Sequence, residues 1–162
     1  MKIVIVDEND QLLGSKERNS LKNTDIYRVS GLWLTNPEGE ILLAQRSFSK
    51  KHDPGKWGPA AAGTIEEGET YKDNIIKEAE EELGLKNLSF TEGPKLRMST
   101  DHQYFVQWFT SVIDKRTQDI KIQQKEVESV RWMTKEQLIR DFNLNPELYL
   151  KGAPHWIKIF CR

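Results

Sequence analysis

The sequence has little of three features that would place it in a specialised class. It contains one cysteine, Cys161, so no disulfide can form within the chain, which agrees with a reducing cytosol. It has no apolar run long enough to cross a bilayer, and its mean hydropathy is −0.66. Its 24 basic and 25 acidic residues leave a net charge of −1. We therefore expect a cytoplasmic protein that binds neither a nucleic-acid polymer nor a membrane surface.

The chain is long enough for one domain, and no linker, repeat or low-complexity segment divides it. We expect residues 1–162 to form a single domain with a sizeable core. The first residues are too few and too acidic for a signal peptide and instead predict a strand. The predicted strands cover residues 2–6, 26–34, 40–45, 88–90, 95–99 and 102–113, and the predicted helices cover 134–142 and part of 146–160, which Pro154 interrupts.

One segment, residues 63–85, carries the strongest pattern in the chain, and it begins as a capped helix should. It reads GTIEEGETYKDNIIKEAEEELGL. Thr70 is the predicted N-cap, with Asp73 three residues later as the acidic partner of a capping box. Gly84 has the residue type that ends helices in the left-handed conformation. The pattern predicts a helix between Thr70 and Gly84.

This helix gathers carboxylates on one side. On a helical wheel, Glu78, Glu81 and Glu82 share an arc of about 100°. Hard divalent cations such as Mg²⁺ and Mn²⁺ prefer oxygen ligands of this kind. A solvated acidic face is the alternative reading for the cluster taken alone. An apolar stripe next to the acidic one is predicted to face the core, and its members are Ile75, Ile76, Ala79 and Leu83.

The spacing of these residues resembles the Nudix box, G-x5-E-x7-R-E-U-x-E-E-x-G-U, in which U is aliphatic. Two positions differ from this pattern: Lys77 replaces the arginine, and Ala79 is a small member of the aliphatic class. Lysine keeps the charge but loses the planar fork of a guanidinium, which puts the closure of the loop in doubt. The matching positions are Gly63, Glu69, Glu78, Glu81, Glu82, Gly84 and Leu85.

The resemblance implies a fold, a reaction and a set of site residues. The implied fold is α+β, an α/β/α sandwich around a mixed β-sheet. The implied enzyme is a pyrophosphohydrolase that uses Mg²⁺ or Mn²⁺ to cleave a diphosphate linkage in a small nucleoside-diphosphate-like or other diphosphate compound. Homodimers are common in the family. By position, Glu78 and Glu82 resemble metal ligands, Glu81 a ligand or the general base, the Gly63 carbonyl a further ligand, and Glu69 a group held by the box arginine.

The flanking sequence resembles the Nudix branch that contains isopentenyl-diphosphate isomerase. In that branch Arg46 and Lys50 match residues that grip a diphosphate, and Arg18 is a third candidate. An ordinary solvated basic loop is the alternative. The isomerase needs a cysteine just before the box glycine, where this chain has Ala62, and one of its metal-binding histidines matches Tyr27. A hydrolase is therefore expected, with an isomerase and a non-catalytic diphosphate-binding domain as alternatives.

The remaining candidates carry weaker signals. Acidic residues ahead of a strand in the family sometimes supply a ligand or the base, which makes Glu126 and Glu128 candidates, although an ordinary strand-edge role is favoured for both. His52 and His102 are candidates for phosphate or metal contact, with an ordinary loop role favoured. Core packing is favoured over nucleobase stacking for the tryptophans, namely Trp33, Trp57, Trp108 and Trp132. Nothing in the sequence identifies the group attached to the diphosphate.

Overall fold

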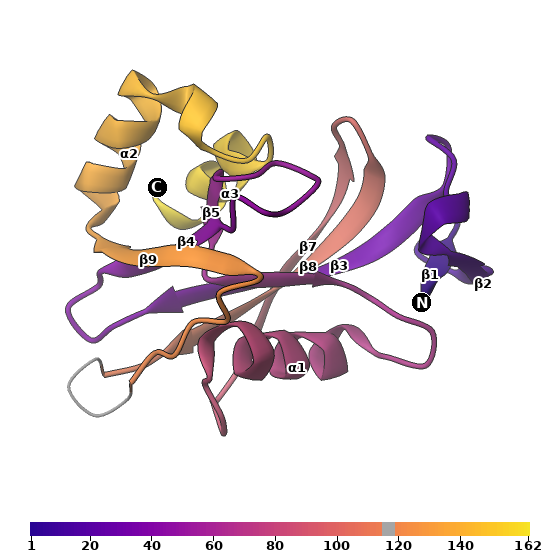
Figure 1. Ribbon diagram of the computed structural model, residues 1–162, viewed down its shortest axis with the longest axis horizontal. Helices are drawn as coiled ribbons and strands as arrows, with labels where there is room; N and C mark the ends of the chain where they lie inside the picture. Colours follow the sequence, from indigo (N-terminus) through magenta and orange to yellow (C-terminus); the bar gives the residue numbers. More distant parts are fainter. Residues whose placement is uncertain (115–118) are drawn as a thin grey trace.

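The computed structural model describes residues 1–114 and 119–162, and within them strands and helices follow one another along the whole chain (Figure 1). No helix of these ranges combines the length and the apolar character needed to cross a membrane. The elements are β1 (Lys2–Val6), β2 (Leu12–Glu17), the 3₁₀ turn η1 (Arg18–Ser20), β3 (Ile26–Thr35), β4 (Ile41–Arg46), β5 (Trp57–Pro59), β6 (Ala61–Thr64), α1 (Tyr71–Leu83), β7 (Thr91–Ser99), β8 (Gln103–Val112), β9 (Val127–Met133), α2 (Lys135–Leu144), η2 (Pro146–Leu148) and α3 (Ala153–Phe160).

The described strands form one mixed sheet organised around β3. Strand β3 pairs in parallel with β8 over its whole length, from Ile26 opposite Gln103 to Thr35 opposite Val112. It pairs antiparallel with β1 and β6, and β8 pairs antiparallel with β7. Strand β4 carries β5 and β9 as antiparallel neighbours. The parallel pairing of β3 with β8 makes the sheet mixed, as expected.

Helices cover both faces of this sheet, because the strands at its centre are apolar on both sides (Figure 1). On β3, Leu32 and Leu34 pack in a core beneath α1, while Trp33 between them packs in a core beneath α2 and α3. The side chains of a strand point alternately to opposite faces, so this split follows from the pleat. The result is the expected α/β/α sandwich.

Helix α1 begins and ends where the sequence predicts. The Thr70 hydroxyl accepts from the Asp73 backbone N–H, and the Asp73 carboxylate accepts from the Thr70 N–H, which completes the capping box. Gly84 ends the helix with a φ of 67°, in the left-handed region that favours glycine. Of the predicted apolar stripe, Ile75, Ala79 and Leu83 are buried, but Ile76 is 43% exposed. Ile76 lies at the edge of the stripe on the helical wheel.

Two predictions about secondary structure were wrong. Residues 88–90 form no strand; Leu88 and Phe90 instead pack as partly buried anchors against the core under α1. Pro154 does not interrupt a helix but lies in the first turn of α3. Proline is tolerated there because the backbone N–H groups of a first turn have no partner within the helix.

Candidate functional site

A cleft of about 1060 Å³ collects most of the residues that the sequence singled out. It is bordered by the second half of α1, the segment after β4, and the sheet face around β3 and β8. Two of the acidic candidates, Glu69 and Glu128, are not part of its wall. The predicted residues that line the cleft are Arg18, Arg46, Lys50, Gly63, Glu78, Glu81 and Glu82, together with Glu126, His52 and His102.

The acidic wall of the cleft contains a pair of interacting carboxylates. Glu78 and Glu82 lie one helical turn apart on α1 and hydrogen-bond to each other. Burial raises the pKa of both groups, and for Glu82 the bond to Glu78 and its charge raise the pKa further, well above the ordinary value. The raised pKa values mean that two negative charges at this position oppose each other. Glu81 lies next to the pair and is exposed to the cleft.

These residues fit a divalent cation by their chemistry. At a partly buried carboxylate pair with raised pKa values, a cation would relieve the repulsion between the two charges. Among the described residues, no three His, Cys, Asp or Glu side chains already stand in an arrangement that would hold a metal ion. Gly63 lies against the pair: a Cβ added there would be 2.6 Å from Glu78 Cγ. The backbone of β6 can approach Glu78 this closely only because residue 63 is glycine.

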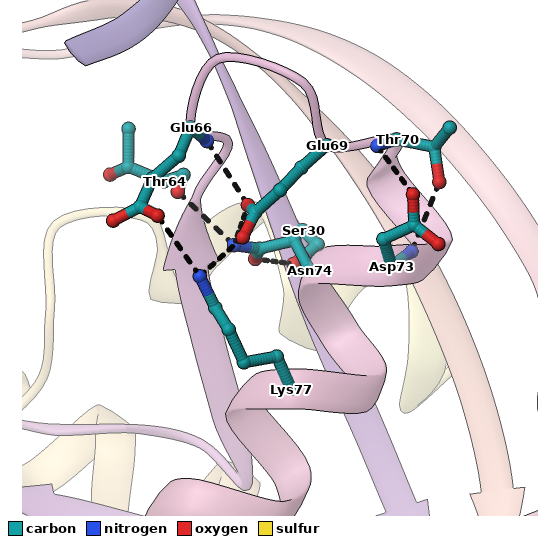
Figure 2. A network of polar contacts seen from close by, with 8 residues as sticks. All are labelled: Ser30, Thr64, Glu66, Glu69, Thr70, Asp73, Asn74 and Lys77. Atoms are coloured by element: carbon teal, nitrogen blue, oxygen red, sulfur yellow. Dashed lines mark hydrogen bonds and ion pairs between the residues drawn. The ribbon is translucent and has the colours of Figure 1, made fainter. Parts of the chain in front are cut away.

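A polar network beside the acidic wall fastens the Glu66–Glu69 loop to α1 (Figure 2). The Lys77 ammonium donates to Glu69 Oε1 and, at 3.3 Å, to Glu66 Oε2. The amide of Asn74 donates to Glu69 Oε2 at 2.9 Å. Burial raises the pKa of Glu69, but the hydrogen bonds from Lys77 and Asn74 outweigh it, so the pKa lies below its ordinary value. Glu69 therefore stays ionised, and the lysine that replaces the box arginine still closes the loop.

The basic side of the cleft is formed by the end of β4 and the segment that follows it. Arg46 Nε donates to the His52 carbonyl at 3.0 Å, which holds this segment in a closed turn. Lys50 forms an ion pair with Glu126, a residue just before β9. Arg18 lies in η1, on another part of the rim. The structure thus brings the three predicted cations to the same cleft as the acids, with Glu126 in contact with one of them.

One section of the wall is a cluster of rings in which the candidates His52 and His102 meet two tyrosines that the sequence did not predict as wall residues. Tyr27 on β3 and Tyr104 on β8 are register partners whose rings stack 5.7 Å apart. His102 meets Tyr27 edge-on, and His52 meets His102, each at 6.4 Å between ring centroids. Burial raises the pKa of Tyr27 to about 12, with a smaller contribution from Tyr104, so Tyr27 is a neutral phenol near pH 7. The parallel pairing of β3 and β8 creates this cluster, and no local signal in the sequence announces it.

Most of the tryptophans pack in the cores, the role that the sequence favoured over nucleobase stacking. Trp33 and Trp108 are buried in the core under α2 and α3, although Trp108 also borders the cleft. Trp132 packs partly buried against the core under α1. Trp57 is half-buried, and the Arg131 guanidinium lies over its ring at 4.6 Å.

The chain is similar to known proteins in sequence and in structure. A family model described as NUDIX domain matches residues 26–152. An uncharacterized Nudix hydrolase of Pseudomonas aeruginosa is 30% identical over 141 residues, which are 86% of this chain and 82% of that protein. An isopentenyl-diphosphate Delta-isomerase of Salmonella heidelberg is 34% identical over 91 residues, or 55% of this chain and 50% of the isomerase. The chain therefore matches about half the length of that enzyme.

A solved structure has the same fold over the full length. The crystal structure of DR0079 from Deinococcus radiodurans superposes with a TM-score of 0.87 and covers 100% of both chains. The sequence identity is 22%, so this likeness concerns the fold alone.

Proposed function

The chain belongs to the Nudix family of pyrophosphohydrolases, and from that premise we propose that it cleaves the diphosphate linkage of a small nucleoside-diphosphate-like or other diphosphate compound with the help of Mg²⁺ or Mn²⁺. One observation carries the proposal. The carboxylates of Glu78, Glu81 and Glu82 and the cations of Arg46 and Lys50 line one cleft. A phosphoanhydride held by the cations would have its phosphates beside the carboxylates.

The acidic wall is the part that we propose to hold the cation. Glu78 and Glu82 would be its ligands, with Glu81 and the Gly63 carbonyl as further candidates. A divalent cation in this position supplies two effects, since it neutralises phosphate charge and makes a water molecule more acidic. Oxygen ligands alone favour Mg²⁺ or Mn²⁺ over softer metals.

The other residues have roles that need no metal. Arg46, Lys50 and Arg18 would orient the phosphates, because guanidinium and ammonium groups both donate to phosphate oxygens. Glu81 is exposed to the cleft and is our candidate for accepting a proton from the attacking water, in addition to its candidacy as a ligand. Glu69 and Lys77 would act beside the carboxylates by holding the loop against α1.

The test is a phosphate-release screen of the purified protein with Mg²⁺ or Mn²⁺ against nucleoside diphosphates and triphosphates, sugar nucleotides, dinucleotides and prenyl diphosphates. We expect Glu82→Gln and Glu81→Gln each to lower turnover by at least about 100-fold, more than the 10–100-fold typical of losing a residue that only supports a ligand. EDTA should abolish turnover in the wild type. Wild-type rates in both variants would contradict the assignment of these glutamates.

A matched control is available on the same helix. Glu80 is exposed, pairs with Lys86 and does not line the cleft. Glu80→Gln should therefore keep the wild-type turnover while making the same chemical change.

The screen also tests the alternative isomerase activity, which Ala62 disfavours because that reaction requires a thiol at this position. Sustained conversion of isopentenyl diphosphate without phosphate release would replace the hydrolase with the isomerase, and tight binding of a metal–diphosphate without any turnover would favour a non-catalytic domain.

A further inference from the structure

Asn74 is a polar side chain with no solvent exposure, and its hydrogen bonds join three separate parts of the chain. Its Oδ1 accepts from the Ser30 hydroxyl on β3. Its Nδ2 donates to the Thr64 carbonyl on β6 at 3.1 Å and to Glu69 Oε2 at 2.9 Å (Figure 2). A buried amide with its donors and acceptor satisfied holds its neighbours at fixed distances, because breaking any of these bonds would leave a polar group unpaired in the interior.

The two carboxylate oxygens of Glu69 accept hydrogen bonds from different donors. Lys77 donates to Oε1, whereas Asn74 and the Glu66 backbone N–H donate to Oε2, the latter at 3.1 Å. An arginine at position 77 would present two parallel N–H groups to both oxygens of one carboxylate. The Lys77 ammonium is a point charge. It donates to only one oxygen of Glu69, and its second hydrogen bond goes to Glu66. Asn74 supplies the donor that the lysine lacks.

Asn74 also lies beside the backbone that faces the carboxylate pair. A Cβ added to Gly63 would be 2.6 Å from Asn74 Oδ1 and 2.6 Å from Glu78 Cγ. Asn74 and Glu78 are one turn apart on α1, and both touch β6 at this residue. The bond from Asn74 to the Thr64 carbonyl, one residue further along β6, therefore sets how closely Gly63 approaches Glu78.

We infer that Asn74 and Lys77 together replace the two-pronged arginine of the Nudix box, and that Asn74 is a positioning residue for the cation site formed by Glu78, Glu82 and Gly63. This inference rests on the proposed function. Asn74 touches neither substrate nor metal. It acts by holding Glu69 and β6 against α1, which keeps Glu78 in place.

The experiment measures Mn²⁺ affinity by isothermal titration calorimetry in the wild type, Asn74→Ala, Lys77→Arg and the double variant. We expect Asn74→Ala to weaken Mn²⁺ binding about tenfold or more, in the range found when a residue supporting a metal ligand is lost. Lys77→Arg should bind within about twofold of the wild type, because the cation is kept. In the Lys77→Arg background, Asn74→Ala should cost only about threefold, because the guanidinium then spans both oxygens of Glu69.

A control separates positioning from general loss of stability. Leu138 is fully buried on α2 in the other core, and Leu138→Ala should lower the melting temperature while leaving Mn²⁺ affinity unchanged. Should Asn74→Ala fail to fold, Ser30→Ala takes its place in both backgrounds. It keeps every donor of Asn74 and removes only the hydroxyl that orients the amide, so we expect a smaller loss of affinity that Lys77→Arg again reduces.

Each result supports or overturns the inference. Unchanged Mn²⁺ affinity in Asn74→Ala, or in Ser30→Ala where that variant is used, overturns it, as does an equal loss in Leu138→Ala. A loss that Lys77→Arg does not reduce overturns the division of Glu69 between the two residues. A wild-type protein that binds no Mn²⁺ removes the proposed function and the inference together, whereas wild-type binding and hydrolysis with an unaffected Asn74→Ala variant leave the proposed function intact.

Discussion

Asp10 joins four parts of the fold through one carboxylate. It accepts from Arg28 Nε on β3 and Lys95 Nζ on β7, both at 2.7 Å, and from the Tyr71 hydroxyl at the start of α1 at 2.9 Å. Its own φ of 59° lies in the left-handed region, which aspartate and asparagine tolerate better than most residues. Burial raises the pKa of Asp10, but the hydrogen bonds from Lys95, Arg28 and Tyr71 outweigh it, so the pKa lies below its ordinary value.

This lowered pKa predicts how stability depends on pH. Because the folded pKa is below the ordinary value of 3.8, the Asp10 carboxylate stabilises the fold above that pH, and the contribution disappears as the pH falls through the folded pKa. Asp10→Asn keeps the backbone preference and removes the charge. We expect it to lower the free energy of unfolding by about 2 kcal/mol at pH 7, the scale of hydrogen bonds to a charged group.

Urea unfolding of both proteins from pH 7 down to pH 2 tests this expectation. The gap between wild type and Asp10→Asn should narrow steadily below about pH 4, where Asp10 of the unfolded chain begins to take up a proton while that of the folded protein stays ionised. A gap of constant size over the whole range would show that the charge of Asp10 does not carry the effect.

For single residues, the sequence predicted which acidic side chains line the cleft but not which residues hold them in place. The spacing of Glu78, Glu81 and Glu82 placed them on one side of a helix, which the structure bears out, because spacing along a helix is a local property. Asn74 was missed, since an asparagine in the first turns of a helix is ordinary. Its burial depends on Ser30, which is 44 residues away in the sequence and next to it in space.

Among the elements, α1 carries the acidic wall and is the best defined by local sequence. The capping box at Thr70 and the glycine at its end fix its bounds, and its last carbonyls are further satisfied from outside the helix. The backbone N–H groups of Lys121 and Gln123 donate to the Leu83 and Glu82 carbonyls at 2.9 and 3.0 Å. Both ends of the helix are therefore held, with the carboxylate pair between them.

We expect the N-cap of α1 to contribute measurably to stability. Thr70→Ala removes the hydroxyl that accepts from the Asp73 N–H, and we expect it to lower the free energy of unfolding by about 1 kcal/mol. Thr70→Ser keeps an acceptor at the same position and should retain most of the stability. Denaturant unfolding of the three proteins gives the comparison, and equal destabilisation by alanine and serine would mean that the hydroxyl bond is not responsible.

The errors at the level of elements have a common cause. A short apolar segment such as residues 88–90 has the composition of a strand, yet periodicity cannot distinguish a strand from a stretch that only anchors a core. Pro154 was read from its usual effect inside a helix, whereas its position relative to the helix start decides the outcome. Both cases depend on tertiary neighbours, which a local pattern does not contain.

The overall arrangement of the sheet is set by the parallel pairing of β3 with β8, which local sequence patterns do not predict. These strands lie far apart in the sequence, and their pairing creates both the mixed sheet and the Tyr27–Tyr104 section of the cleft. Strand patterns predicted that both strands exist. Their arrangement was anticipated only through the resemblance to a known family, because hydrophobic periodicity gives the face of a strand and not its partner.

Cation binding should stabilise the entire fold, because the site exists only when α1 and β6 are packed together. A ligand that binds the folded state alone adds about 2.7 kcal/mol at a concentration 100 times its dissociation constant. We expect Mn²⁺ to raise the melting temperature of the wild type, EDTA to reverse the rise, and Glu82→Gln to show a much smaller response. An equal Mn²⁺-dependent rise in Glu82→Gln would place the responsible cation elsewhere.

The Glu78–Glu82 pair has a consequence for how the sequence evolves. Without a cation, two partly buried acids in contact oppose folding, so amide or apolar replacements there would give a sturdier protein. Selection for stability alone would therefore replace Glu78 and Glu82. Under the proposed function, persistence of the pair in a descendant or an engineered variant would mean that selection acts on turnover rather than on stability.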